Sequence, residues 1–310
     1  MVPPTLVLTR TELRQAVDLP VLAAQLRRAL VLYQEDGQAQ RVRSQPSRLV
    51  TSMVLAPGTA PGVPAYTVKV HAKNPRRRPA LTGVMCLHDS ESGDLMALLD
   101  SGWLTSVRTG VGAALGTDEL ARQDARTFGV IGAGEQGRAQ LAALRALRAP
   151  SSVCIFDLDP AAAASLADEL QESGVDACTA TTAQDVAAAC DVLLLATWSR
   201  TPVLVLRDVK PGTHITSLGA DEPGKVELDP QLLAAACVVT DDADLAAPVL
   251  PHVTTTLSRV LRKEHPGREK REQLTVYSPL GLPLQDCVVA WHAYERARDL
   301  GLGTRVSLEV

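Results

Sequence analysis

The sequence predicts an α/β fold in two domains, one a doubly wound parallel sheet and the other an α+β domain. Three observations lead to this prediction. The chain has 310 residues, which is more than most single domains contain. Between residues 41 and 99, short apolar runs are separated by Pro, Gly and Asp-Ser clusters, a pattern of antiparallel strands. From Thr127 onward, strand-like and helix-like runs alternate, which favours a parallel sheet.

The first domain is predicted to begin with two helices. Thr9 and Glu12 have the spacing of a capping box ahead of a short helical turn, which Pro20 interrupts. Because proline suits the first turn of a helix, residues 20–33 are predicted to form a second one. Strand candidates follow at 48–55, 65–70, 82–87 and 95–99. The cap residues at 104–106 then predict a helix that leads into the second domain.

The second domain is predicted from strand-like runs with helices between several of them. These runs are 127–131, 152–156, 191–196, 214–218 and 237–240. The end of the chain, residues 274–310, holds a strand candidate and a helix from about Asp286 to Leu300. We expect this end to return to the first domain. The predicted domain bounds are residues 1–115, completed by 275–310, and residues 116–274.

Composition excludes several classes of protein. The net charge of −4 argues against nonspecific nucleic-acid binding, and the basic run at 73–78 has no interleaved aromatic residues, so we interpret it as a solvated loop. No window approaches the roughly 18 uninterrupted apolar residues of a membrane span. The six cysteines stand singly, which favours buried thiols over a zinc site or disulfides. Because no secretion signal is visible, we expect a cytoplasmic protein with neither nucleic acid nor membrane as partner.

A glycine triplet stands between a predicted strand and a predicted helix. Gly132, Gly134 and Gly137 fit the pattern Gly-x-Gly-x-x-Gly. In such a turn the first glycine permits a tight bend, the second permits close approach of a pyrophosphate, and the third lets helix and strand pack closely. The N-terminus of the helix favours the phosphate charge. This context predicts a dinucleotide site, while a strand-turn-helix without a ligand is the alternative for the triplet alone.

An acid follows at the end of the next predicted strand. Asp157 lies about 20 residues downstream, where an acid binds the adenosine ribose hydroxyls. This position predicts NAD rather than NADP as the cofactor, because a carboxylate repels a 2′-phosphate. Asp159 is a second candidate for this role, and a solvated strand end is the alternative for both aspartates.

Six stretches of the chain together form a specific set. They are PSR at 46–48, YTVK at 66–69, LTSVRTGVGAAL at 104–115, VIGAGEQG at 130–137, KPGTHITSLGADEPGKVELD at 210–229 and TVYSPLGLPLQD at 275–286. With them the chain resembles the ornithine cyclodeaminase/mu-crystallin family over almost its whole length. The resemblance implies a Rossmann-type NAD(P)-binding domain beside a substrate domain that also forms a homodimer. It further implies redox chemistry at a carbon–nitrogen bond alpha to a carboxylate.

Four residues are candidates for the substrate site. An arginine fork suits bidentate carboxylate binding, and a lysine beside it can polarise the reacting centre or exchange a proton with it. The resemblance places Arg48 and Arg108 at the substrate carboxylate, with Lys69 nearby. It also places Thr82 in the lining of the pocket. A solvent-facing charge is the alternative for any single Arg or Lys, and an ordinary strand threonine is the alternative for Thr82.

Asp221 is the candidate acid/base, with Lys69 as the second catalytic residue. Asp221 follows a predicted strand at its carboxyl end, where ligands collect in open α/β sheets. The resemblance assigns it the catalytic role, and a turn aspartate ahead of Pro223-Gly224 is the alternative. The residues implied on the cofactor side are Thr109, Gly132, Ala133, Gly134, Glu135, Gln136, Gly137, Asp157, Thr197, Leu218, Gly219, Lys225 and Ser278.

The predicted function is an NAD(H)-dependent oxidoreductase for an α-amino or cyclic α-imino acid, of the ketimine reductase or amino-acid dehydrogenase type. An ornithine or lysine cyclodeaminase that releases ammonia is one alternative. The resemblance implies that such enzymes hold the distal amine with an acid after the first arginine, yet no Asp or Glu lies between Val50 and Tyr66. A member that binds its ligand without turnover is the other alternative.

Overall fold

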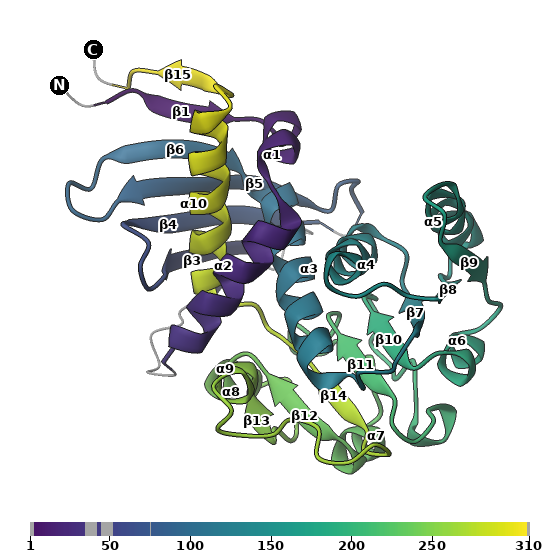
Figure 1. Cartoon of the computed structure of the whole chain (residues 1–310). Coiled ribbons are helices and arrows are strands. Elements are labelled where there is room, and N and C mark those ends of the chain that lie inside the picture. The colour runs from purple at the N-terminus through teal and green to yellow at the C-terminus, as the bar shows by residue number, and fades with distance from the viewer. Residues whose placement is uncertain (1–2, 35–41, 45–51, 75, 309–310) are drawn as a thin grey trace. The chain divides into compact units, whose positions relative to one another are not determined.

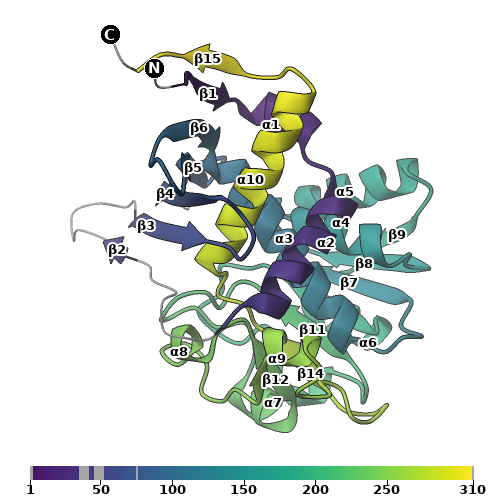
Figure 2. The same ribbon diagram turned by 60° about the vertical axis from the view of Figure 1, so that its left-hand side comes forward.

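The computed structural model describes residues 3–34, 42–44, 52–74 and 76–308. The chain divides into two compact units. Unit 1 comprises Met1–Arg108 and Leu282–Val310, and unit 2 comprises Thr109–Gly281. Figures 1 and 2 show the elements of each unit, coloured from the N-terminus to the C-terminus. Over the described ranges, no helix has the length and apolar character needed to cross a bilayer.

Unit 1 contains a mixed sheet, whose described part has seven strands in the order β15-β1-β6-β5-β4-β3-β2. Its strands are β1 (Thr5–Leu8), β2 (Val42–Ser44), β3 (Ser52–Thr59), β4 (Ala65–Lys73), β5 (Leu81–Asp89), β6 (Leu95–Asp100) and β15 (Thr304–Val306). Strands β2 to β6 pair antiparallel in sequence order, while β1 pairs parallel with β6 and antiparallel with β15. The antiparallel prediction is confirmed, except that residues 48–51 of the first strand candidate lie outside the described residues.

The helices of unit 1 begin at local sequence signals, which are side-chain caps for the first three and a proline in the first turn for the last. They are α1 (Arg10–Ala16), α2 (Leu19–Leu32), the first part of α3 (Ser101–Leu120), and α10 (Pro283–Asp299). The predicted capping box is confirmed, because Thr9 and Glu12 accept each other's backbone N–H through their side chains. Asp18 caps α2 by accepting the N–H of Val21 at 3.0 Å, and Pro20 lies in the first turn as predicted.

The start of α3 differs from the prediction. Cap residues were expected at 104–106, but the helix already begins at Ser101. The cause is Asp100, the last residue of β6, whose Oδ1 accepts the N–H of Trp103 at 2.8 Å and so caps the helix. Thr105 and Ser106 therefore lie inside the helix, where both are buried.

One face of the unit 1 sheet is covered by α10, which packs against β3, β4 and β5 and contacts α1 and α2 (Figure 1). On β4, buried side chains alternate with partly exposed ones, and Lys69 and His71 belong to the buried set. The opposite face is more open, since Leu55 is 44% exposed and Val70 is 42% exposed. Two titratable side chains of β4 are thus placed inside unit 1.

Unit 2 contains a parallel sheet of eight described strands in the order β13-β12-β14-β11-β10-β7-β8-β9. Its strands are β7 (Thr127–Ile131), β8 (Ser152–Phe156), β9 (Asp176–Thr179), β10 (Val192–Leu195), β11 (His214–Ser217), β12 (Cys237–Thr240), β13 (Thr255–Thr256) and β14 (Thr275–Tyr277). All neighbouring strands run parallel, which confirms the predicted sheet. The order reverses between β7 and β10, and ligands of open α/β sheets bind at the carboxyl ends beside such a point.

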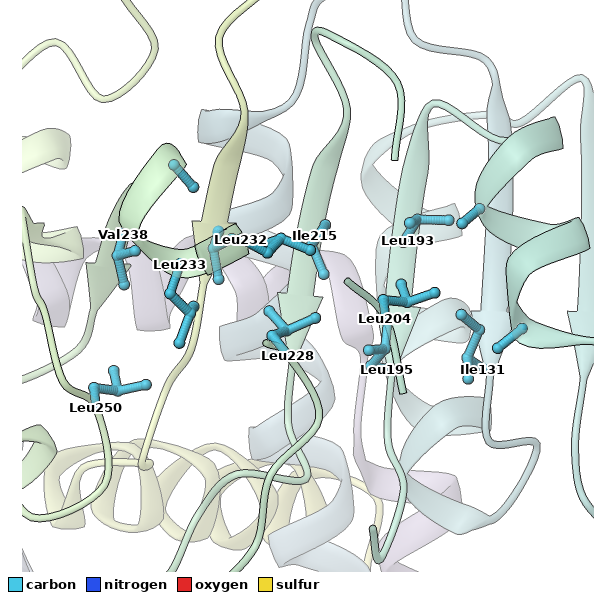
Figure 3. Packing of buried hydrophobic residues seen from close by; sticks show 14 of the residues in the cluster. Ile131, Leu193, Leu195, Leu204, Ile215, Leu228, Leu232, Leu233, Val238 and Leu250 are labelled. Atoms are coloured by element: carbon cyan, nitrogen blue, oxygen red, sulfur yellow. The ribbon is translucent and has the colours of Figure 1, made fainter. Parts of the chain in front are cut away.

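Helices connect these strands and share an apolar core with them. They are α4 (Glu135–Leu147), α5 (Pro160–Glu172), α6 (Ala183–Ala189), the 3-10 helix η1 (Leu206–Asp208), α7 (Pro230–Ala235), α8 (Ala243–Ala246) and α9 (Leu257–Leu261). Figure 3 shows Leu193 and Leu195 of β10 and Ile215 of β11 packed with Leu232 of α7, all fully buried. Each such side chain contributes about 1.5–3 kcal/mol through burial, so this core fixes the strand ends that carry the site.

The boundaries of the units differ by a few residues from the expected bounds. β14 pairs with β11 and β12, so the chain leaves unit 2 only after Gly281 rather than before residue 275. At the other boundary, unit 1 ends at Arg108 within α3 rather than at residue 115. The assignment of substrate binding and dimerisation to unit 1 stays a prediction.

Candidate active site

A buried ion cluster lies in unit 1, with members on β4, α3 and α10. Lys69 Nζ lies 2.5 Å from Asp286 Oδ2, and Arg108 Nε donates to Asp286 Oδ1 at 2.9 Å. Arg108 Nη1 also donates to Gln285 Oε1 at 3.2 Å. The three charged side chains are at most 8% exposed. Two cations thus share one carboxylate in this cluster, an arrangement suited to an incoming anion.

His71 lies on the same face of β4, two residues beyond Lys69. Its Nδ1 is buried and has no hydrogen-bond partner among the described residues. Burial, together with the charges of Lys69, Arg108 and Lys73, lowers the pKa of His71 to about 3, while the charge of Asp286 opposes this shift. The imidazole is therefore neutral near pH 7, and three cations against one carboxylate act on it.

The other two predicted substrate residues are Arg48 and Thr82, and the structure describes only Thr82. Arg48 lies outside the described residues, so its contact with a carboxylate stays a prediction. Thr82 pairs with Ala72 in the register of β4 and β5, whereas Lys69 pairs with Met85. Because successive residues of a strand point to opposite faces, Thr82 lies on the face of the sheet opposite to Lys69.

The glycine turn connects β7 to α4 in unit 2. Gly132 has a φ of +100°, and a Cβ on it would lie 2.6 Å from the carbonyl oxygen of Ala196. A Cβ on Gly137 would collide with the carbonyl oxygen of Gly132, whereas a Cβ on Gly134 would meet nothing within 4 Å. Gly134 is also the N-cap of α4, and no side chain caps this helix. Close packing thus requires the first and third glycines, while the second faces open space where a phosphate fits.

Asp157 lies directly against this turn. Its Oδ2 accepts the N–H of Ala133 at 2.7 Å, and its Oδ1 accepts the N–H of Asp159 at 2.8 Å. Asp159 instead caps α5 by accepting the N–H of Ala161 at 3.1 Å. The two aspartates therefore differ in position, and Asp157 is the one that contacts the glycine turn.

The remaining cofactor candidates of unit 2 mostly follow strands of its sheet. They are Thr197 after β10, Leu218 and Gly219 after β11, and Ser278 after β14. Because the strands are parallel, their carboxyl ends share one edge with the glycine turn. Glu135 and Gln136 begin α4 beside that turn, and Thr109 lies on α3 where unit 2 begins. Across the described ranges, no group of His, Cys, Asp or Glu is arranged to hold a metal ion.

Asp221 lies in the segment after β11 and is paired with Lys225. Lys225 Nζ is 2.8 Å from Asp221 Oδ1 and 3.2 Å from Glu222 Oε1. The same ammonium lies over the ring of Trp198, 4.3 Å from its centroid. Lys225, predicted on the cofactor side, is thus in direct contact with the predicted acid/base.

Two carboxylates around these groups were not predicted as site residues. Asp286 holds both Lys69 and Arg108 in unit 1. Glu227 is fully buried in unit 2 and accepts four hydrogen bonds from residues after β10 and at the end of β11. Burial raises the pKa of Glu227, and these hydrogen bonds oppose the shift. Both residues occur in stretches that carry the family resemblance, which is the signal that could have indicated them.

Comparison with known proteins gives the chain a family and near relatives. The model of the ornithine cyclodeaminase/mu-crystallin family matches residues 4–301. Among curated relatives, an alanine dehydrogenase of Archaeoglobus fulgidus is 31% identical over 324 aligned positions, which cover 97% of this chain and 98% of that protein.

Two solved structures are similar to the whole chain. An archaeal alanine dehydrogenase dimer with bound NAD has 30% identity and a TM-score of 0.90, covering 98% of this chain and 99% of that one. The Δ1-pyrroline-2-carboxylate reductase of Thermococcus litoralis, in complex with NADH and L-proline, has 28% identity and a TM-score of 0.90, covering 97% and 100%. With a family model matched from residue 4 to residue 301, the chain belongs to the ornithine cyclodeaminase/mu-crystallin family.

Proposed function

We propose that the protein is an NAD(H)-dependent oxidoreductase that acts at the carbon–nitrogen bond of an α-amino or cyclic α-imino acid. The observation that carries this proposal is the buried cluster in which Lys69 and Arg108 share Asp286. A substrate carboxylate would balance the second cation, and the guanidinium fork of Arg108 matches its geometry. Similarity to an alanine dehydrogenase and a pyrroline-2-carboxylate reductase supports this reaction class.

NAD(H) supplies or accepts the hydride when it is bound. The open space at Gly134 and the N-terminus of α4 suit its pyrophosphate, and Asp157 beside the glycine turn suits its adenosine ribose. A carboxylate at this position disfavours a 2′-phosphate, so we expect NADH to be preferred over NADPH. The NAD and NADH in the two similar structures support the choice of cofactor.

In this reaction, side chains of the protein bind the substrate and transfer the proton. Reduction of an imine adds a hydride to carbon and a proton to nitrogen, and oxidation of an amine removes both. We assign the proton to the carboxylate of Asp221, which Lys225 holds at 2.8 Å. Arg108 and Lys69 hold the substrate carboxylate in this assignment, and Lys69 is close enough to Asp286 to exchange a proton with it.

Electrostatics in unit 1 disfavour the cyclodeaminase alternative. A cyclodeaminase must accommodate the ammonium group at the far end of ornithine or lysine. Three cations and one acid act on His71, so the surroundings carry excess positive charge. In addition, no Asp or Glu lies between Val50 and Tyr66. A second positive charge on the substrate would therefore be repelled, whereas a cyclic imino acid or alanine brings no such charge.

Turnover by the purified protein tests this proposal. With NADH and Δ1-pyrroline-2-carboxylate or Δ1-piperideine-2-carboxylate, the nicotinamide absorbance should fall, and Asp221→Asn should lower the rate by about 10²-fold or more, as expected for loss of a general acid. Glu222→Gln is the matched control, because Glu222 also contacts Lys225 yet has no assigned proton. Wild-type protein that binds NADH but is inert with these imino acids, and with alanine plus NAD⁺, would instead favour the non-catalytic alternative. Ammonia released from ornithine would favour the cyclodeaminase.

We also propose that the protein is a homodimer formed through the open face of the unit 1 sheet. Leu55 and Val70 are exposed there, and Tyr66 and Val68 are only partly buried. A contiguous apolar sheet face of this kind marks an interaction surface. The dimer of the similar archaeal alanine dehydrogenase supports this assembly. Sedimentation velocity measures it, and a monomer at micromolar concentration would contradict it.

A further inference from the structure

We propose that Glu227 is a positioning residue, which closes the base of the loop that carries Asp221 and fixes that loop against the segment after β10. The loop is defined as residues 218–226 and is called the acid loop below. The proposal rests on the proposed function, because it matters for the reaction only if Asp221 exchanges the proton. It adds a residue that touches neither substrate nor cofactor but sets the place of one that does.

The carboxylate of Glu227 connects two strand ends. Its Oε2 accepts hydrogen bonds from Ser217 Oγ at 2.6 Å and from the N–H of Gly219 at 2.8 Å. Its Oε1 accepts from the N–H of Thr197 at 2.6 Å and from Thr197 Oγ1 at 2.8 Å. Ser217 and Gly219 flank the start of the acid loop, and Glu227 follows its end. The side chain therefore ties both ends of the loop together and joins them to the neighbouring segment.

The backbone around Glu227 is fixed as well, so the side chain has a firm support. The carbonyl oxygen of Glu227 accepts from the N–H of Val203 at 2.7 Å and from the N–H of Leu204 at 3.2 Å. The preceding Val226 donates its N–H to the carbonyl of Ser199 at 2.9 Å. The main chain of residues 226–227 is hydrogen-bonded to residues 199–204, and the carboxylate of Glu227 is hydrogen-bonded to Thr197 and to the start of the acid loop. Glu227 can therefore hold the acid loop in a fixed position relative to residues 197–204.

A second link runs parallel to the first. Trp198, next to Thr197, lies under the ammonium of Lys225, which is paired with Asp221. Adjacent residues after β10 thus contact the acid loop at two points, one at its base through Glu227 and one near Asp221 through Lys225. Loops that are held in this way keep a proton-transferring group within reach of its partner.

Gly219 provides an independent sign that the carboxylate fits tightly. A Cβ on Gly219 would collide with Glu227 Oε1 and with the carbonyl oxygen of Thr197. The φ of Gly219 is not among the positive values that require glycine. Glycine is therefore required here by the closeness of Glu227 and of the Thr197 carbonyl oxygen, and not by a positive φ.

The hydrogen bonds also explain why this residue must be an acid rather than an amide. Each carboxylate oxygen accepts one backbone N–H, from Thr197 on one side and Gly219 on the other. A backbone N–H cannot reverse its direction, whereas a hydroxyl can. In Glu227→Gln, the amide nitrogen must therefore face one of these two N–H groups in either orientation, and one strand end is released.

Binding and rate measurements on Glu227→Gln test the proposal. The probes are NADH, which reaches the nicotinamide side, and ADP-ribose, which occupies only the side of the glycine turn. We expect unchanged affinity for ADP-ribose, NADH affinity weakened by about tenfold, and kcat lowered by about 10²-fold, as for a misplaced catalytic group. Ser217→Ala removes one of the four hydrogen bonds and should shift the same quantities in the same direction by less.

Asp191→Asn is the control for loss of a carboxylate elsewhere in the same sheet. Asp191 directly precedes β10, at the opposite edge of the sheet, where it accepts the N–H groups of Arg126 and Thr127 and forms an ion pair with Arg122 at 2.7 Å. Asp191→Asn should lower stability without changing the affinity for NADH relative to that for ADP-ribose. Folded Glu227→Gln with wild-type NADH affinity and kcat would overturn the proposal, as would equal losses for both probes. If Glu227→Gln does not fold, the same affinity and kcat measurements on Ser217→Ala decide whether the proposal holds. If the wild-type protein is inert with all imino acids, the proposed function is contradicted. The comparison of NADH and ADP-ribose affinities can still be made.

Discussion

Asp286 in unit 1 and Glu227 in unit 2 are both buried carboxylates that use both oxygens, yet their partners differ in charge. Asp286 lies between the cations Lys69 and Arg108. Among the described residues, Glu227 accepts only from neutral backbone and hydroxyl groups. A carboxylate between cations determines how much positive charge is left for a ligand, whereas one among neutral donors determines where its donors lie. Asp286 therefore has an electrostatic role in unit 1, whereas Glu227 has a positional role in unit 2.

Replacing each carboxylate by its amide is the strongest test of this difference between Asp286 and Glu227. In Asp286→Asn, the amide nitrogen must face either Lys69 or Arg108, so one buried cation loses its ion pair with this side chain. Breaking a buried ion pair in this way costs about 3–5 kcal/mol, while leaving a buried neutral donor unpaired costs about 1–3 kcal/mol. We therefore expect urea unfolding to show a larger loss of unfolding free energy for Asp286→Asn than for Glu227→Gln.

Asp100→Asn is the control for an ion pair near the surface. Arg10 and Asp100 are 3.3 Å apart, with side chains 31% and 27% exposed. Asparagine keeps an acceptor for the N–H of Trp103, so only the ion pair is lost. Partly exposed pairs contribute up to about 1 kcal/mol. Equal losses for Asp100→Asn and Asp286→Asn would show that burial of the cluster has no energetic consequence.

The same comparison shows which parts of the site a sequence can predict. The glycine turn could be predicted because its requirements are local, since Gly132, Gly134 and Gly137 act within one strand-turn-helix. The parallel sheet could be predicted from the alternation of strands and helices. Asp157 could be predicted for a similar reason, since it ends the next strand. The order of the parallel strands and the burial of β10 and β11 then place the remaining candidates at one edge.

Contacts between distant residues could not be predicted. Arg108 and Asp286 are 178 positions apart, and Thr197 and Glu227 are 30 apart, so no spacing rule connects them. Thr82 illustrates the reverse problem, because a shift of one residue in the register decides which face of a strand a side chain occupies. The start of α3 depended on a side chain at the end of the preceding strand, Asp100, rather than on the threonine and serine inside the helix.

A further expected effect concerns His71, on which the cations of unit 1 act. The unfolded chain binds a proton at this imidazole near its ordinary pKa of 6.5, but in the folded protein burial and the cations lower the pKa to about 3. Between these values the unfolded state binds more protons, so stability is complete above pH 6.5 and is lost as the pH falls. The expected loss from His71 is about 2 kcal/mol between neutral pH and pH 5.

Comparing wild type with His71→Asn isolates this loss, because other groups titrate in the same range. Burial also lowers the pKa values of His214 and His292, which add losses in acid, whereas burial raises the pKa of Glu227, which acts in the opposite direction. These terms are common to both proteins and cancel in the difference. Urea unfolding from pH 7 to pH 5 should therefore give a smaller slope for His71→Asn. Parallel curves would mean that His71 gains its proton equally in both states, and that the cations around Asp286 do not reach it.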